Sequence, residues 1–133
     1  MFLWRPLCVV QFLTLLAIFI YLGLTPSPES SVPMFNDKLM HFTGYFIAGG
    51  SISFAFPLRK IWQRASFLIL FSIGIEISQH FMPPRTFDFF DIGANSSGVI
   101  LGLLWIGFLA KNLTWFRQLL HWQITVAHHK KTD

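Results

Sequence analysis

Long apolar stretches separated by short polar segments dominate the pattern along the chain. The first stretch runs from Leu7 to Leu24 and is interrupted only by Gln11 and Thr14. At about 1.5 Å of rise per residue, a helix of this length covers most of a hydrocarbon core about 30 Å thick. The pattern therefore predicts a transmembrane helix over residues 7–24. A cleaved signal peptide is the alternative, but no clear small-x-small cleavage site precedes the proline- and serine-rich segment that follows.

Three more helices are predicted at residues 37–56, 61–82 and 91–110, because prolines and basic or acidic residues bound each apolar run. Pro57 ends the first of them, and Pro83 with Pro84 ends the second. Residues 112–133 mix aromatic with basic side chains, which is typical of a helix lying in the membrane interface. The sequence thus predicts one domain, residues 1–133, of the all-α membrane class. The predicted domain has four transmembrane helices and a C-terminal amphipathic interfacial helix.

The composition supports a membrane environment. Hydrophobic residues make up 53% of the chain and charged residues only 12%, about half the charged share of a soluble domain. The net charge of +4 does not indicate nucleic-acid binding, because the basic residues form short clusters beside the apolar runs. The single cysteine, Cys8, excludes an intramolecular disulfide and a thiolate metal cluster, and it is expected to be a small apolar residue inside a helix.

The distribution of lysine and arginine predicts the orientation in the membrane. With the N-terminus in the cytoplasm, two basic residues, Lys38 and Arg85, lie on the outer side. The cytoplasmic side then holds the other eight: Arg5, Arg59, Lys60, Arg64, Lys111, Arg117, Lys130 and Lys131. We therefore expect a multi-pass membrane protein with both termini in the cytoplasm.

Polar residues gather where three predicted helices meet the outer face. Asp37, His41 and Tyr45 are spaced four apart, which puts them on one stripe of the helix 37–56. Glu76 and Gln79 form a second stripe, continued by His80, on the helix 61–82. Glu76 lies about 9 Å below the outer helix end, where an ionisable group is a candidate functional residue.

The start of the helix 91–110 carries a third group of polar residues. Asp91 and Asn95 precede Gly98 and Gly102 along one face. The Gly-x-x-x-Gly step allows another helix to approach closely, which directs Asp91 and Asn95 toward the bundle interior. Asp88, just before them, is a candidate cap for this helix.

Two interpretations of these polar residues compete. In the structural one they link three helices by hydrogen bonds and cap the last of them. In the functional one they line an outward-facing pocket, and we favour it because helix linkage alone rarely needs so many ionisable groups at one end. The candidate pocket residues are Asp37, Lys38, His41, Tyr45, Glu76, Gln79, Arg85, Asp91 and Asn95, with Gly98 and Gly102 as packing residues.

The same residues resemble the VanZ family of bacterial membrane proteins. The segment from Asp37 to Tyr45 is similar to the family's Asp-Lys-x-x-His-x-x-x-Tyr. Further on, Glu76-x-x-Gln79, then Arg85 and the Asp91-x-x-x-Asn95-x-x-Gly98 segment follow the family's order. The resemblance spans about residues 37–102 and implies a multi-spanning protein of the cell envelope, in the bacterial cytoplasmic membrane. The founding member is linked to low-level teicoplanin resistance, and the resemblance implies no known reaction.

The sequence is compatible with three functions. In the first, the pocket binds a lipid or cell-wall precursor head group, with Lys38 and Arg85 facing phosphate. In the second, an integral membrane hydrolase or transferase uses a divalent metal held by Asp37, His41, Glu76, His80 and Asp91. The third is a small scaffold for a membrane complex. We lean toward a protein that is not an enzyme, has no cofactor and no resident metal, and whose partners are membrane lipids rather than nucleic acid.

Overall fold

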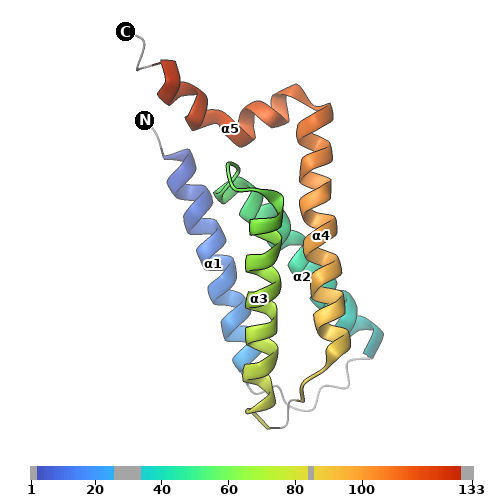
Figure 1. Ribbon diagram of the computed structural model, residues 1–133. Helices are drawn as coiled ribbons and strands as arrows, with labels where there is room; N and C mark the ends of the chain where they lie inside the picture. The colour runs from blue at the N-terminus through green and yellow to red at the C-terminus, as the bar shows by residue number, and fades with distance from the viewer. Residues whose placement is uncertain (1–2, 26–33, 84–85, 130–133) are drawn as a thin grey trace.

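The computed structural model describes residues 3–25, 34–83 and 86–129. They form five helices and, within these ranges, no strand (Figure 1). The helices are α1 (Trp4–Leu24), α2 (Met34–Ala55), α3 (Ile61–His80), α4 (Phe89–Asn112) and α5 (Thr114–His129). The predicted all-α class is therefore confirmed for the described residues.

The ends of the four long helices lie within three residues of the predicted ones. The largest differences are at the starts of α1 and α2, where the helix begins before the apolar run. Pro6 is tolerated in the first turn of α1, since the N–H groups there have no partner within the helix. At the start of α4, the Asp88 side chain accepts the backbone N–H of Phe90 at 2.8 Å, so the helix begins at Phe89.

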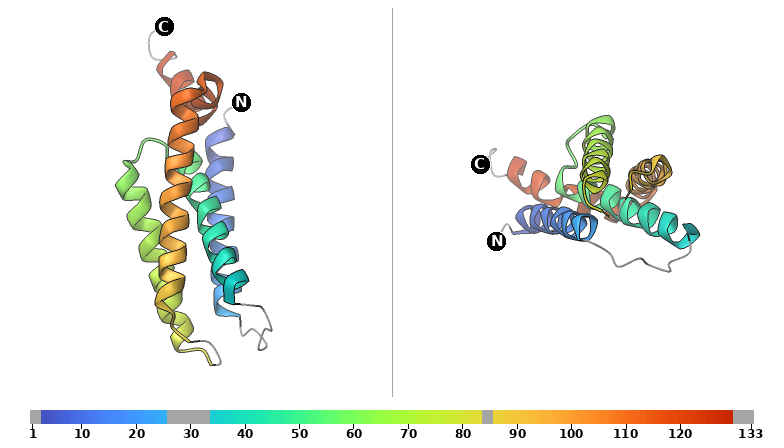
Figure 2. Two further views of the ribbon diagram at one scale, coloured as in Figure 1. Left: turned by 90° about the vertical axis from the view of Figure 1, so that its right-hand side faces the viewer. Right: turned by 90° about the horizontal axis from the view of Figure 1, so that it is seen from below.

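The bundle is built around α2, which contacts α1, α3 and α4 (Figure 2). Its approach to α4 is very close. A Cβ atom added at Gly98 or Gly102 would lie 2.3 Å from the carbonyl oxygen of Phe42 or Phe46. One added at Gly49 would lie 2.9 Å from the carbonyl oxygen of Val99. Only glycine permits this backbone contact between the two helices.

A small apolar core fills the space between the four long helices. Its buried members come from α1, α2, α3 and α4, and they are Phe12, Leu16, Tyr45, Ala48, Ile52, Ala55, Leu68, Val99 and Leu103. Many large apolar side chains point outward instead, such as Leu70 on α3 at 67% exposure and Leu104 on α4 at 54%. Such an exposed apolar surface is typical of helices facing lipid.

Three helices of the described chain, α1, α3 and α4, are long and apolar enough to cross a membrane. The helix α2 is of similar length, with 22 residues, but it is less apolar. Its glycines and serines, among them Ser51 and Ser53, are largely buried against its neighbours. Small and polar residues that permit tight packing lower the hydropathy of α2.

The last helix, α5, crosses the end of the bundle where α1 begins (Figure 1). The indole Nε1 of Trp4 donates to the carbonyl oxygen of Leu119 at 3.1 Å. Phe116 and Leu120 are buried on the bundle side of α5, whereas Trp115 is 62% exposed. The opposite end of the bundle holds the start of α2 and the start of α4, and the polar residues lie there.

Candidate functional site

Lys38 is at the centre of the polar residues and joins α2 to the start of α4. Its Nζ donates to Asp88 Oδ2 at 2.5 Å and also to Asp91 Oδ1. The Oδ2 atom of Asp37 lies 3.8 Å from the same nitrogen. One ammonium thus neutralises two carboxylates from α4 and lies near a third from its own helix.

The Lys38 ammonium, helped by the backbone N–H of Phe90, holds the pKa of the Asp88 carboxyl below its usual range. Both interactions favour the charged carboxylate. Asp88 lies outside the membrane-crossing part of α4 as its N-cap. It therefore serves two purposes, since one oxygen caps α4 and the other binds Lys38.

A chain of hydrogen bonds leads from His41 into the bundle. His41 on α2 places Nδ1 3.0 Å from Asn95 Oδ1 on α4, and Asn95 Nδ2 donates to Ser72 Oγ on α3 at 2.9 Å. Tyr45 is buried at 6% exposure within the apolar core. Asn95 and Ser72 are buried, at 2% and 1% exposure, so the side chains satisfy one another away from solvent.

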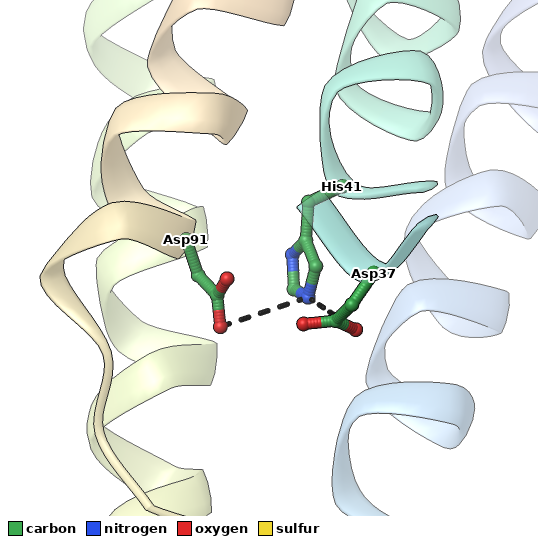
Figure 3. Close-up of side chains that lie close together, drawn as sticks. All are labelled: Asp37, His41 and Asp91. Atoms are coloured by element: carbon green, nitrogen blue, oxygen red, sulfur yellow. Dashed lines mark ion pairs between the residues drawn. The ribbon is translucent and has the colours of Figure 1, made fainter. Parts of the chain in front are cut away.

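Asp37, His41 and Asp91 form a compact group (Figure 3). The imidazole Nε2 of His41 lies 3.8 Å from Asp37 Oδ1 and 3.8 Å from Asp91 Oδ2. One ligand atom from each residue lies within 4.8 Å of the others, a spacing from which a metal ion can be held with a small inward movement. Lys38 competes for Asp91, because it donates to that carboxylate.

Glu76, predicted to lie below the outer end of its helix, is almost fully buried at 1% exposure. Its Oε1 accepts the backbone N–H of Asp88 at 2.9 Å. This bond ties α3 to the residue that caps α4. Glu76 therefore contacts the backbone of Asp88, whose side chain binds Lys38.

Three other candidate residues are not brought into this group. Gln79 donates to the carbonyl oxygen of Gly23 at 2.9 Å and so faces the end of α1. His80 is exposed and packs on Phe81, with ring centroids 5.5 Å apart, so the metal set that included it is not assembled. Arg85 lies outside the described residues. We use the name polar cluster for the residues that do meet: Asp37, Lys38, His41, Asp88, Asp91 and Asn95.

A groove of about 470 Å³ adjoins the polar cluster between α2 and α4. Lys38 lies at its polar end, and its walls include the apolar side chains of Leu39, Phe42, Phe89 and Phe90. Phe89 and Phe90 are also 79% and 78% exposed to the surroundings. The arrangement offers a charged group and an apolar wall side by side.

Reasoning from the sequence missed Ser72 as a member of the hydrogen-bond network and Asp88 as a partner of Lys38. Ser72 precedes Glu76 by four residues, so the helical stripe through Glu76 would have included it. Asp88 was expected only to cap α4, and nothing in the spacing indicates that Lys38, 50 residues earlier, reaches it.

Comparison with known proteins gives the family. The family model described as VanZ/LLP1 matches residues 9–111. An uncharacterized protein of Schizosaccharomyces pombe, C11E3.10, is 37% identical over an alignment of 106 residues that covers 75% of this chain. The chain spans only 62% of the length of that relative. No solved structure matches the chain. The match over residues 9–111 covers α2, α3, α4 and most of α1 and confirms the expected resemblance: this chain belongs to the VanZ/LLP1 family.

Proposed function

We propose that this protein binds the charged head group of an amphiphile, a lipid or a lipid-linked cell-envelope precursor, at the polar cluster. The observation that carries the proposal is the groove between α2 and α4, whose apolar wall leads directly to Lys38. Ligand pockets commonly have volumes of ~300–1,000 Å³ and combine apolar walls with a few polar groups. A groove of about 470 Å³ fits the first part of an acyl chain and its head group.

The charges around Lys38 favour a zwitterionic head group. An ammonium has three N–H donors, and two of those of Lys38 are used by Asp88 and Asp91. The third is available to a phosphate oxygen. A neighbouring amine of the same ligand would pair with Asp37, whose side chain is 46% exposed. A head group with one phosphate and one amine, such as phosphoethanolamine, provides an acceptor for Lys38 and a cation for Asp37.

The proposal includes a bundle of four transmembrane helices, with α2 crossing beside α4 and α5 lying in the interface. At about 1.5 Å per residue, the 22 residues of α2 reach across a hydrocarbon core. The excess of basic residues at the α5 end supports termini on the cytosolic side, which in a bacterium is that of the cytoplasmic membrane. The polar cluster then faces the opposite side and takes its ligand from the outer leaflet.

A groove-filling substitution tests head-group binding. A Cβ atom added at Gly93, which lines the groove, meets nothing within 4 Å, so Gly93→Leu fills the groove without a clash at Cβ. Gly107 on the same helix is equally open and does not line the groove, which makes Gly107→Leu the matched control. Binding of phosphatidylethanolamine to the full chain in detergent, followed by native mass spectrometry, should fall in Gly93→Leu and persist in Gly107→Leu. Equal binding by the two variants would remove the groove from the proposal.

A metal-dependent hydrolase or transferase is the second candidate, favoured by the group of Asp37, His41 and Asp91. Carboxylate and imidazole ligands hold Zn²⁺ or Mn²⁺, which can lower the pKa of a bound water. This candidate ranks second because Lys38 already binds Asp91 and would have to yield to the cation. Metal analysis of the purified protein, with and without chelator, tests it.

A further inference from the structure

Four basic side chains gather at the α5 end of the bundle, opposite the polar cluster. They are Arg5 on α1, Arg64 on α3, and Arg117 and His121 on α5, and we call them the basic cluster. Desolvation, Arg5, Arg117 and Arg64 all lower the pKa of the His121 imidazole, in that order of size. The three guanidinium groups are therefore close enough to act on one imidazole. The acidic residues whose side chains the structure describes, Asp37, Glu76, Asp88 and Asp91, belong to the other end.

Arg5 is held by the C-terminal end of α2 and by the middle of α5. Its guanidinium donates to the carbonyl oxygens of Phe54 and Ala55, at 2.9 and 3.1 Å, and to that of Leu120 at 3.1 Å. Carbonyls at a helix C-terminus carry the negative end of the helix dipole, so a cation is well placed there. Arg5 thereby connects α5, which carries Arg117 and His121, to the C-terminal end of α2.

Arg64 differs from Arg5, because its buried Nε has no hydrogen-bond partner among the described residues. A buried donor without an acceptor costs free energy comparable to a lost hydrogen bond, and such groups commonly mark an unseen water or ion. The edge of a guanidinium formed by Nε and one Nη matches two oxygens of a phosphate. The missing partner of Arg64 is best supplied by an oxyanion.

The surface around the basic cluster indicates where that oxyanion comes from. Trp115 and Trp122 on α5 are 62% and 54% exposed. Exposed tryptophans beside apolar helices are typical of the membrane interface, where phospholipid phosphates lie. We therefore propose that the basic cluster binds the phosphate of an anionic phospholipid from the leaflet at the α5 end, with Arg64 as its principal ligand. The family match covers residues 9–111, so Arg64 lies inside the matched range, whereas Arg5, Arg117 and His121 lie outside it.

Lipid titration of the full chain tests the proposal. The protein in detergent is titrated with phosphatidylglycerol or phosphatidylcholine and bound lipid is counted by native mass spectrometry. Wild type should prefer phosphatidylglycerol, and Arg64→Gln should bind it about tenfold more weakly because a charge-assisted pair is lost. Arg59→Gln, an exposed arginine in the turn before α3, should stay within about twofold of wild type.

Two results would overturn the assignment. If Arg64→Gln binds phosphatidylglycerol as wild type does, the basic cluster is not the site. If millimolar inorganic phosphate displaces the lipid or stabilises the protein equally, the ligand is a soluble anion and not a lipid. Because the phosphatidylethanolamine test of Gly93→Leu addresses the opposite end, the two proposals can fail separately.

A second measurement does not depend on how the Arg64 variant folds. A bound phosphate opposes the field of the three arginines, so the pKa of His121 should rise when phosphatidylglycerol is added to wild type. NMR of labelled histidine, assigned with His121→Gln, reads this pKa. An unchanged pKa with saturating phosphatidylglycerol would contradict binding at the basic cluster.

Discussion

Asn95 on α4 and Ser72 on α3 form a buried side-chain hydrogen bond of 2.9 Å. The other half of the Asn95 amide faces the imidazole of His41 on α2. A single side chain therefore connects three helices at the depth where the polar cluster ends. Such interhelical links contribute to holding the helices in register.

We expect Asn95→Leu to lower the free energy of unfolding by about 1 kcal/mol, because it removes two interhelical hydrogen bonds. Thermal melting in detergent measures the loss. Ser97→Ala is the control on the same helix, since the Ser97 hydroxyl bonds only its own helix at the carbonyl oxygen of Gly93. Equal melting temperatures for the two variants would show that the Asn95 bonds add nothing to stability.

The glycine contact between α2 and α4 leads to a second prediction. Gly98→Ala places a Cβ atom 2.3 Å from the backbone oxygen of Phe42, so the helices must separate. Overpacking of this kind costs about 1–3 kcal/mol. Gly107→Ala meets nothing within 4 Å and should be neutral or stabilising, because alanine is the better helix former. Melting temperatures of both variants in detergent measure this difference in stability. A Gly98→Ala protein as stable as wild type would contradict the observed approach of α2 to α4.

The helices could be predicted from the sequence because apolar runs of about 20 residues between prolines have few alternatives. The spacing of Asp37 and His41 likewise indicated a shared helix face, and Asp37 Oδ1 lies 3.8 Å from His41 Nε2. These are local features. Periodicity within one helix determines them, whatever the neighbouring helices do.

Which side chains meet across helices could not be predicted in the same way. Gln79 was expected beside the polar cluster, yet it bonds Gly23 on α1, because a stripe gives a direction and not a partner. Lys38 was expected to face a phosphate, and the two carboxylates of α4 to which it donates were not predicted as its partners. Arg5 was counted only as a charge that orients the chain, whereas it caps α2 and holds α5. Each of these depends on the relative placement of helices.

A third prediction concerns pH. Lys38 lowers the pKa of Asp88 from its ordinary value of 3.8, so the pair stabilises the folded state above that pH. The contribution is lost as the pH falls through the lower folded value, where the carboxylate takes up its proton. The difference in melting temperature between wild type and Lys38→Met should therefore be largest near neutral pH and become smaller in acid. Lys60→Met, an exposed lysine at the other end, should show no such convergence. A constant difference from neutral to acid would mean that the pair does not contribute through charge.

The last prediction separates the two candidate functions through the same lysine. In Lys38→Met the carboxylates of Asp88 and Asp91 lose the ammonium that neutralises them, and Asp37 and His41 remain beside them. A divalent cation should then bind better to the variant than to wild type. At a concentration ~100 times Kd it would raise the free energy of unfolding by about 2.7 kcal/mol. Melting temperatures with and without Mn²⁺ or Zn²⁺ report this, with Lys60→Met as the control. Metal stabilisation of wild type as well as of the variant would mean that Lys38 yields to a cation in the native site, and the hydrolase would then rank first. Stabilisation confined to Lys38→Met would mean that the lysine keeps the carboxylates metal-free and available for a head group.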